Sequence, residues 1–318
     1  MKVYIGQDVS VSGPEFLLKK GYEVIMASKA DPLIWMKEIG DADAFFSRGT
    51  IGCPGCVFDV DNNLKVIGNY GVGTDKLDVM RATELGIWVT NTPIANTVSV
   101  AEHTIALILA LASDLLELDR ETREGNWEIR NSGLSTELYG KTLGIIGYGA
   151  IGRKVAAYSM SLGMKILIYS RHPEAVEKWE VSLDEIFSQS DFITLHVPLT
   201  SQTYHMVGAR ELSLMKKSAF LINCARGGIV DDCELYKSLL QKKIAGAALD
   251  CLEDEPATAN CPLFRLDNVI VDPHTAGQTR EAGERMSLHA AMGIDDVLQG
   301  RKPQWSVNHP EHLRQSLS

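Results

Sequence analysis

Apolar residues in the first third of the chain form short runs separated by longer amphipathic stretches. Each run has the length of a strand that is buried on both faces. The stretches between the runs, such as 14–20, have the pattern of helices. Alternating strands and helices predict a parallel sheet with helices on both faces, which binds ligands at the carboxyl ends of its strands. The runs are Val3–Ile5, Val24–Ala27, Ala44–Ser47, Lys65–Gly68 and Trp88–Thr90.

The second half of the chain repeats this alternation. The sequence therefore predicts the α/β class, with two doubly wound parallel-sheet domains. A final helical stretch, 278–298, is long enough to return to the first domain. We expect one discontinuous domain, residues 1–97 and 287–318, and a second domain of residues 98–286. The strand-like runs of this second domain are Leu143–Ile146, Ile166–Tyr169, Phe192–Leu195, Ala219–Asn223, Gly246–Leu249 and Val269–Val271.

The stretch that follows the first domain is helical in pattern and apolar nearly all round. Ser99 and Glu102 have the spacing of a capping box, which predicts that the helix begins there. An apolar helix of this kind is expected to be buried between domains or subunits, and it therefore predicts a homodimer. His103 is interpreted as a packed helix residue rather than a ligand.

Length, composition and charge limit the number of domains and the kinds of partner that the chain can have. The 318 residues suit about two domains, and 45% hydrophobic with 23% charged residues is ordinary for a globular protein. The net charge of −10 argues against a nucleic-acid partner and an anionic membrane. The N-terminus has neither the apolar core of a secretory signal nor a transit-peptide composition, so a cytoplasmic location is expected.

The six cysteines are expected to be reduced in that compartment. Cys53 and Cys56 form a CPGC pair, which is compatible with a redox or metal role. No second CxxC and no paired histidine spacing accompanies the pair. We therefore interpret both cysteines as loop residues and predict no metal site.

Three glycines follow the run Leu143–Ile146 in a GxGxxG pattern and open the helix-like stretch 153–162. Gly147 permits a tight turn, Gly149 leaves the backbone bare for a pyrophosphate, and Gly152 lets the helix pack close to the strand. Phosphates then bind at the helix N-terminus, where unpaired N–H groups and the helix dipole favour negative charge. Because strands precede and follow the pattern, it predicts a Rossmann-type dinucleotide site.

The end of the next strand bears on the choice of dinucleotide. An acidic residue that would bind an adenosine ribose is expected near position 170. The chain has Ser170, Arg171 and His172 there, and the first carboxylate is that of Glu174. A hydroxyl beside a guanidinium suits a ribose 2′-phosphate better than a ribose hydroxyl, so NADP is predicted in preference to NAD. The alternative is an exposed loop arginine without a role.

Two strand ends of the first domain are suited to an anion. Arg48 follows one of the predicted strands, and Gly71 and Gly73 follow another. Glycines at these positions free successive backbone N–H groups to form an anion-binding concavity. A plain turn is the alternative interpretation.

Three further strand ends, in the second domain, carry residues that could do chemistry. Arg226 follows one strand, the acidic loop 250–256 follows the next, and His274 follows the last. If the strands are parallel, all three lie at the same edge as Gly147. A cation that binds a carboxylate, a proton donor and a carboxylate that orients it are what hydride transfer to a 2-oxo acid requires.

The chain resembles the D-isomer-specific 2-hydroxyacid dehydrogenase family over essentially its full length. The order and spacing of the motifs make the resemblance specific. The motifs are GVGTDKLD (71–78), NTVSVAEH (96–103), LGIIGYGAIG (143–152), SDFITLHVPLT (190–200), LINCARGGIVDD (221–232), AALDCLEDEP (247–256) and DPHTAG (272–277).

The resemblance implies roles for individual residues. Arg226 is the expected substrate-binding arginine, and His274 is the expected proton donor. Glu253, Asp254 and Glu255 are rival partners for His274 by sequence alone, and the family pattern selects Glu255 because it directly precedes proline.

Cofactor and substrate contacts follow from the same resemblance and from the ribose argument. The substrate-binding residues are expected to be Arg48, Val72, Gly73 and Arg226. His196 resembles a position that lines the cofactor site, but it is interpreted as structural. The expected cofactor-binding residues are Gly147, Gly149, Ala150, Ile151, Gly152, Ser170, Arg171, Cys224, Ala225, Arg226, Asp250, His274 and Gly277.

The resemblance implies a Rossmann-type dinucleotide domain, a flavodoxin-like substrate domain and an NAD(P)-dependent oxidoreductase. We expect the enzyme to interconvert a small 2-oxo acid, such as glyoxylate or hydroxypyruvate, and the D-2-hydroxy acid. One alternative is oxidation of formate or phosphite on the same scaffold. Another is a dinucleotide-sensing binding protein, like the corepressors that share the fold.

Overall fold

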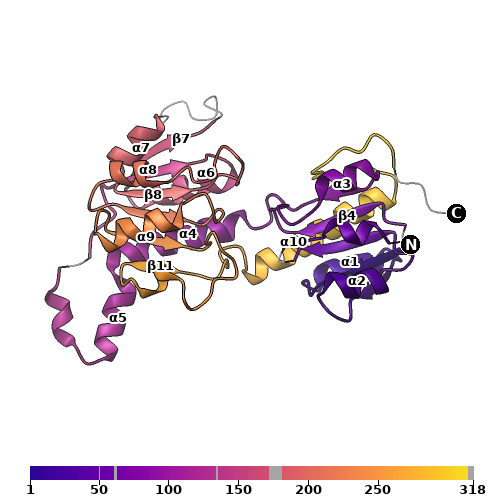
Figure 1. Ribbon diagram of the computed structural model, residues 1–318, viewed down its shortest axis with the longest axis horizontal. Coiled ribbons are helices and arrows are strands. Elements are labelled where there is room, and N and C mark those ends of the chain that lie inside the picture. The colour runs from indigo at the N-terminus through magenta and orange to yellow at the C-terminus, as the bar shows by residue number, and fades with distance from the viewer. Residues whose placement is uncertain (50, 61–62, 134, 172–180, 314–318) are drawn as a thin grey trace. The chain divides into compact units, whose positions relative to one another are not determined.

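The computed structural model describes residues 1–49, 51–60, 63–133, 135–171 and 181–313. The chain divides into two compact units (Figure 1). The first unit comprises Met1–Asn96 and Gln278–Ser318, and the second unit comprises Thr97–Gly277. The return segment of the first unit begins before residue 287 because the whole of helix α10 packs on that unit's sheet and on α1.

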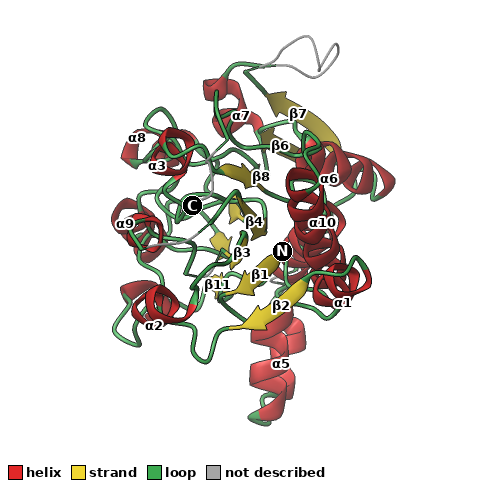
Figure 2. Ribbon diagram, turned by 90° about the vertical axis from the view of Figure 1, so that its right-hand side faces the viewer, coloured by secondary structure: helices red, strands yellow, loops and turns green. Residues whose placement is uncertain are grey.

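The first unit is built on a five-stranded parallel sheet with the strand order β2-β1-β3-β4-β5, which is the flavodoxin-like order. Figure 2 shows α1 and α10 on one side of these strands and α2 and α3 on the other. The strands are β1 (Lys2–Ile5), β2 (Glu23–Met26), β3 (Ala44–Arg48), β4 (Val66–Tyr70) and β5 (Trp88–Thr90). The helices are α1 (Ser12–Lys19), α2 (Pro32–Glu38), α3 (Val79–Glu84) and α10 (Arg280–Leu298).

The second unit is built on a six-stranded parallel sheet with the strand order β11-β10-β9-β8-β6-β7. Its strands are β6 (Thr142–Ile146), β7 (Lys165–Tyr169), β8 (Phe192–Leu195), β9 (Phe220–Asn223), β10 (Gly246–Leu249) and β11 (Val269–Val271). Its helices are α4 (Thr97–Ser113), α5 (Leu115–Arg123), α6 (Ala150–Ser161), α7 (Leu183–Gln189), α8 (Ala209–Leu214) and α9 (Asp232–Leu240).

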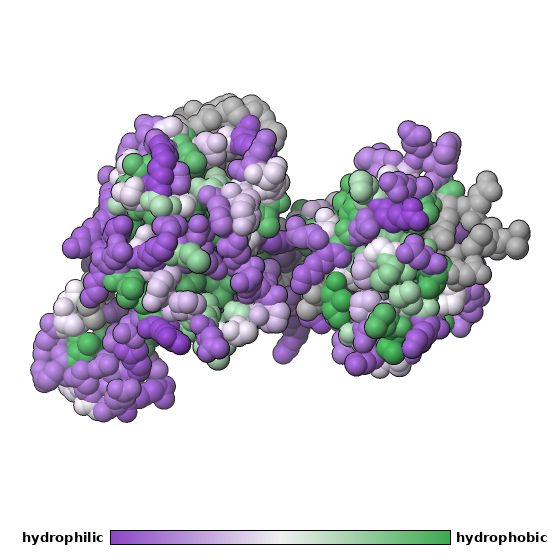
Figure 3. All heavy atoms as spheres, viewed as in Figure 1, coloured by the Kyte–Doolittle hydropathy of each residue, from purple (hydrophilic) through white to green (hydrophobic). Residues whose placement is uncertain are grey.

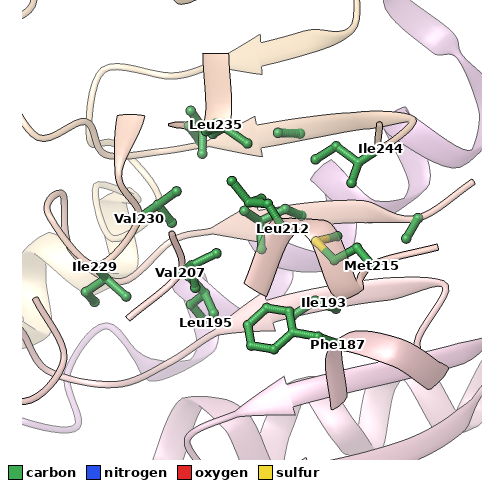
Figure 4. Close-up of a cluster of buried hydrophobic side chains, with 14 of the residues drawn as sticks. Phe187, Ile193, Leu195, Val207, Leu212, Met215, Ile229, Val230, Leu235 and Ile244 are labelled. Carbon is green, nitrogen blue, oxygen red and sulfur yellow. The ribbon is translucent and has the colours of Figure 1, made fainter. Parts of the chain in front are cut away.

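Strand residues of the second unit alternate between two buried cores. Ile145 faces the core that α4 and α6 cover, whereas Ile146 faces the core that α7, α8 and α9 cover. Figure 4 shows part of the second core, where Phe187, Leu212 and the strand residue Ile193 lie close together. Because both faces are covered, the strands read as continuous apolar runs. The two parallel sheets confirm the predicted α/β class.

The carboxyl end of β6 lies at a topological switch point. The chain leaves β6 for β7 on one side, and β8 pairs with the other side of β6. Doubly wound sheets bind ligands at such points, because the connections diverge there and leave room above the sheet edge.

Helix α4 begins at Thr97, so the prediction that Ser99 and Glu102 cap its N-terminus was wrong. The chain enters the helix directly after the turn at Thr92–Ala95, so the helix begins earlier than predicted. Ser99 therefore lies within the first helical turn, where it is buried. Among the described residues no single helix is both long and apolar enough to cross a membrane. Helices α4 and α5 reach that length and apolarity only as a pair, and they are bent by 58° at the break between them.

Candidate active site

The imidazole of His274 contacts the carboxylate of Glu255 at the edge of the second unit's sheet. His274 Nδ1 lies 2.9 Å from Oε2 and 3.1 Å from Oε1 of Glu255. Both side chains are partly exposed, at 43% and 34%. Because Nδ1 faces the carboxylate, Nε2 is the ring atom that is placed to exchange a proton with a substrate.

The loop that follows β10 presents Glu255 in this position. The backbone N–H of Leu252 donates to Glu255 Oε1 at 3.2 Å. The rival carboxylate Glu253 points to another partner set, since its Oε1 accepts from Tyr204 Oη and contacts His205 Nε2, both at 2.9 Å. Of the carboxylates in this loop that sequence reasoning left open, Glu255 is therefore the one that the structure pairs with His274.

Arg226 is carried by the loop that follows β9. The side chain of Asn223 holds this loop, because its Nδ2 donates to the carbonyl of Arg226 and its Oδ1 accepts from the N–H of Ala225. The guanidinium of Arg226 donates to the carbonyl of Ala225 at 2.7 Å. At Gly227, a Cβ atom would lie 1.8 Å from the carbonyl oxygen of Leu252, so only glycine lets this loop reach the acidic loop. The close approach brings the Arg226 loop to the loop of Glu255.

Asp250 is the buried member of the site, at 2% exposure. Its carboxylate accepts hydrogen bonds from the backbone N–H groups of Thr275 (2.7 Å) and Ala276 (3.0 Å to each oxygen). Burial raises the pKa of Asp250, whereas these amide donors and the nearby His274 and His103 lower it. The carboxylate therefore anchors the backbone directly after His274, in addition to the cofactor contact expected from the sequence.

His103 joins this site, which the sequence interpretation as a packed helix residue did not anticipate. It is 28% exposed on α4, and its Nε2 lies 2.9 Å from Asp272 Oδ2 and 3.9 Å from Asp250 Oδ1. No sequence signal indicated the contact, because His103 and Asp272 are 169 positions apart. Within the described ranges, these three residues are the one group of histidine, cysteine and acidic side chains compact enough for a metal ion. Within this group His103 contacts Asp272, whereas Asp250 accepts from the backbone N–H groups of Thr275 and Ala276.

His196 lies beside the glycine turn. Burial lowers its pKa to about 3, so the ring is neutral at physiological pH and does not serve as a proton donor. One ring nitrogen, Nε2, contacts Thr194 Oγ1 at 3.1 Å. Its backbone N–H donates to the carbonyl of Ile146. These contacts agree with the structural interpretation of this residue.

Comparison with known proteins gives the family. Residues 105–276 match the sequence model of the D-isomer specific 2-hydroxyacid dehydrogenase, NAD binding domain, and this stretch is more than half of the 318 residues. The chain belongs to this family. The resemblance seen in the sequence is thereby confirmed.

Individual relatives of the family differ in name and length. The chain is 40% identical to a glyoxylate reductase from Thermococcus gammatolerans, with 96% of each protein covered. It is 37% identical to a D-3-phosphoglycerate dehydrogenase from Archaeoglobus fulgidus, with 98% of this chain but only 60% of that protein covered. An NADPH-dependent glyoxylate/hydroxypyruvate reductase from Sinorhizobium meliloti has a similar structure, with a TM-score of 0.88, 28% identity, and 98% of this chain and 99% of that chain covered.

The glycine turn of the second unit fits the dinucleotide that this dehydrogenase family binds. Gly147 has φ +98°, and a Cβ atom on Gly152 would lie 2.2 Å from the carbonyl oxygen of Gly147. Gly149 is the N-cap of α6, makes no side-chain cap, and has open space where a Cβ would stand. The first turn of α6, with Ala150 and Ile151, carries no acidic residue. Uncapped amides at a helix N-terminus beside bare backbone suit a pyrophosphate.

The residues expected to bind the ribose begin at the carboxyl end of β7. Arg171 is exposed, and its guanidinium donates to Gln202 Oε1 at 3.2 Å. Ser170 directly precedes it, and His172 and Glu174 lie outside the described residues. The remaining residues expected near the cofactor, Cys224 and Gly277, lie at the end of β9 and after β11, on the same sheet edge.

The first unit holds Arg48 at the end of β3. One guanidinium nitrogen donates to the carbonyl of Asp8 at 3.0 Å and the other to Gln278 Oε1 at 3.5 Å. The guanidinium carbon lies 5.4 Å from the centre of the Tyr70 ring. These contacts hold the cation at the carboxyl edge of the first sheet.

The loop after β4 is held by side-chain amides. Asn69 Nδ2 donates to the carbonyls of Gly71 (3.2 Å) and Gly73 (2.9 Å), and Asn91 Nδ2 donates to the carbonyl of Val72 (2.8 Å). Carbonyl oxygens repel an anion, so engaging them favours binding of an anion by the N–H groups of this loop.

The CPGC pair does not form a disulfide. Cys53 is a buried free thiol and Cys56 is a partly buried one. Burial raises the pKa of the Cys53 thiol, so it stays protonated and unreactive.

Proposed function

We propose that this dehydrogenase transfers a hydride between a nicotinamide cofactor and carbon 2 of a small 2-oxo or D-2-hydroxy acid. The contact of His274 Nδ1 with both carboxylate oxygens of Glu255 carries the proposal. A histidine held by a carboxylate is suited to proton exchange. Here the histidine lies at the same sheet edge as the glycine turn that is proposed to bind the cofactor. When bound, the dinucleotide supplies the hydride.

His274 supplies the proton in this proposal. In the direction of reduction, Nε2 donates to the carbonyl oxygen as that oxygen gains negative charge. Glu255 fixes the ring orientation through Nδ1, which leaves Nε2 for the substrate. In the direction of oxidation, the neutral ring accepts the hydroxyl proton from the D-2-hydroxy acid.

Cations and amides bind the substrate in this proposal. The guanidinium of Arg226 binds the carboxylate of the acid and polarises its carbonyl, because a planar cation near the developing oxyanion stabilises the transition state. In the first unit, the amides of Val72 and Gly73 are further proposed donors to a substrate carboxylate, which the engaged carbonyls of their loop support.

Glyoxylate or hydroxypyruvate is the proposed substrate. The glyoxylate reductase from Thermococcus gammatolerans is matched over nearly its whole length, whereas the chain spans about 60% of the phosphoglycerate dehydrogenase relatives. Arg48 is the cation of the first unit that would meet a larger or phosphorylated substrate.

NADP is the proposed cofactor. Ser170 and Arg171 stand at the end of β7, where a carboxylate would otherwise bind the ribose hydroxyls. The exposed guanidinium of Arg171 is suited to a 2′-phosphate. The reductase from Sinorhizobium meliloti, which has a similar structure, is named as NADPH-dependent.

A homodimer is the proposed assembly. Helix α5 has no buried residue in the single chain. Leu115, Leu116 and Trp127 in and after this helix are 56%, 55% and 65% exposed. In Figure 3 this part of the second unit is largely hydrophilic with a hydrophobic patch among the polar atoms. Partner contacts would bury these side chains, and sedimentation of the wild type as a monomer would contradict the proposal.

The experiment that tests the function measures oxidation of NADPH and of NADH with a panel of 2-oxo acids that includes glyoxylate and hydroxypyruvate. Formate and phosphite are offered with the oxidised cofactors in parallel assays. His274→Ala is compared with His309→Ala, because His309 is an exposed histidine of the first unit. We expect turnover of a 2-oxo acid, loss of turnover in His274→Ala, and no change in His309→Ala.

Each alternative has its own outcome. Faster turnover with NADPH supports the Ser170–Arg171 interpretation, and faster turnover with NADH rejects it. Turnover of formate or phosphite, without turnover of any 2-oxo acid, rejects a 2-oxo acid as the substrate. Cofactor binding without turnover of any of these compounds rejects the dehydrogenase proposal in favour of a sensing protein.

A further inference from the structure

The backbone at His274 has an uncommon conformation that its surroundings must hold. Its φ of +56° lies in the left-handed region, which residues with side chains seldom adopt. Such conformations persist where neighbouring contacts over-determine them. The segment from Asp272 to Ala276 is therefore expected to be anchored on both sides of His274.

The downstream anchor is Asp250. Its buried carboxylate accepts the N–H groups of Thr275 and Ala276, which directly follow His274. Asp250 itself sits directly after β10, which is paired on both sides, by β9 and by β11. The anchor thus ties the segment to a rigid strand.

The upstream anchor is His103. Its Nε2 lies 2.9 Å from Oδ2 of Asp272, two positions before His274. The same Nε2 lies 3.9 Å from Asp250 Oδ1, so His103 faces both carboxylates. His103 is on α4, which packs on α6, β9 and β10. One side chain of this helix therefore reaches both anchors of the segment.

We propose that His103 is a positioning residue for His274, acting through Asp272 and through the carboxylate of Asp250. It holds Asp272 by a hydrogen bond, and the same ring nitrogen lies 3.9 Å from Asp250 Oδ1. The role rests on the proposed function, because it matters only if His274 is the proton donor. His103 does not touch the substrate in this proposal.

Two carboxylates face His103, and a buried thiol lies near them. The carboxylates are those of Asp272 and Asp250; burial raises the pKa of Asp250, and the nearby His274 lowers it. The thiol of Cys224 also lies close to both carboxylates, and burial raises its pKa to about 12, so it contributes no charge at physiological pH. His103 is thus the side chain of α4 that contacts Asp272.

The test separates positioning from general support of the fold. His103→Ala removes the donor, whereas His103→Gln replaces the ring Nε2 by an amide nitrogen at a similar reach. Asp272→Ala and the double variant His103→Ala/Asp272→Ala complete a mutant cycle. Glu102→Gln is the matched control, because Glu102 is the exposed neighbour on the same helix. Steady-state kinetics with the best 2-oxo acid and a thermal melt are measured for each.

We expect kcat of His103→Ala to fall about 10- to 100-fold with little change in KM, because a donor displaced by a fraction of an ångström reacts from fewer productive orientations. His103→Gln should recover most of this loss. Asp272→Ala should match His103→Ala, and the double variant should be no slower than either, because both act through one contact. Glu102→Gln should equal the wild type.

NMR of proteins with ¹⁵N-labelled histidine rings gives a second readout that does not need turnover. The chain has eight histidines, and a His274→Gln sample identifies the signals of His274. These signals should shift in His103→Ala and return toward the wild-type positions in His103→Gln. A folded His103→Ala with unchanged kcat and unchanged His274 signals would overturn the proposal. Absence of turnover in the wild type would instead defeat the proposed function, and the ring signals would still decide the role of His103.

Discussion

Glu255 and Glu253, two glutamates of the loop from Asp250 to Pro256, each contact a histidine. Glu255 contacts His274 Nδ1 at 2.9 Å, and Glu253 contacts His205 Nε2 at the same distance. Both histidines have a left-handed backbone, with φ of +56° at His274 and +50° at His205. They are partly exposed to a comparable extent, at 43% and 31%. By pairing and backbone alone, the two sites look alike.

The two rings differ in what their second nitrogen faces. His205 has its Nδ1 3.6 Å from Asp231, so carboxylates lie at both ring nitrogens. Its ring also stacks on Tyr204, with 3.9 Å between the ring centres. His274 is paired through Nδ1, and among the described residues no hydrogen-bond or ion-pair partner faces its Nε2. A histidine–carboxylate pair is therefore suited to proton transfer only where one ring nitrogen remains for the substrate.

The largest expected effect separates these two histidines. His274→Ala should lower kcat about 10²- to 10⁴-fold, the usual contribution of a positioned acid–base group. His205→Ala should keep kcat near the wild-type value, because both of its ring nitrogens face protein carboxylates. Steady-state kinetics of the two purified variants check this. Equal losses of kcat in both variants would show that His205 also takes part in the reaction.

The two glutamates of the loop give the next largest contrast. Glu255→Gln keeps the size of the side chain but replaces one of the two carboxylate oxygens that face His274 Nδ1 by an amide nitrogen, and we expect kcat/KM to fall roughly 10- to 1000-fold. Glu253→Gln removes a carboxylate whose side-chain partners, among the described residues, are Tyr204 and His205, so activity should change little. The same assay measures both variants. A larger loss in Glu253→Gln would mean that the acidic loop was assigned to the wrong carboxylate.

Much of this fold could be predicted from the sequence because both sheets are covered on both faces. The predicted runs Leu143–Ile146 and Phe192–Leu195 lie in β6 and β8, since continuous apolar runs bounded by polar turns define such strands. The start of α4 was less predictable. Ser99 and Glu102 have the spacing of a capping box, but a turn upstream sets the boundary at Thr97.

The site could be predicted only as far as strand order allows. Arg226, Glu255 and His274 each follow a strand, and parallel strands bring such positions to one edge. The choice of Glu255 over Glu253 needed the family pattern, because a loop residue's direction is not encoded by spacing. The contact of His103 with Asp272 depends on how α4 packs on the sheet, and no local pattern reports it.

A smaller effect is expected on the stability of the protein. It concerns Asp232, which lies beside Glu253, the carboxylate partner of His205. Burial, with the nearby Glu253, Asp231 and Asp254, raises the pKa of Asp232 to about 6, although the N–H of Glu253 donates to it at 2.9 Å. The ordinary value in an unfolded chain is about 3.9. A raised carboxyl pKa means that its stabilising contribution is complete below about pH 4 and is lost as the pH rises through about 6.

Asp232→Asn should therefore melt a few degrees higher than the wild type at about pH 8, and the difference should vanish near about pH 4. Thermal melts over this range measure it, with Glu137→Gln, an exposed carboxylate of the same unit, as the control. Equal melting temperatures of Asp232→Asn and the wild type at every pH would contradict the assignment of buried charge to this position.

The smallest expected effect concerns Tyr204, the residue that distinguishes the His205 pair. Its hydroxyl donates to Glu253 Oε1 at 2.9 Å on an exposed part of the surface. Tyr204→Phe keeps the ring that stacks on His205 and removes only this hydrogen bond, so the melting temperature should fall by less than about 2 °C. Activity should be unchanged, because Glu255 is held separately by the N–H of Leu252. If kcat fell in Tyr204→Phe while the melting temperature held, the two pairs on the loop would be mechanically coupled, and the His205 pair would belong to the active site.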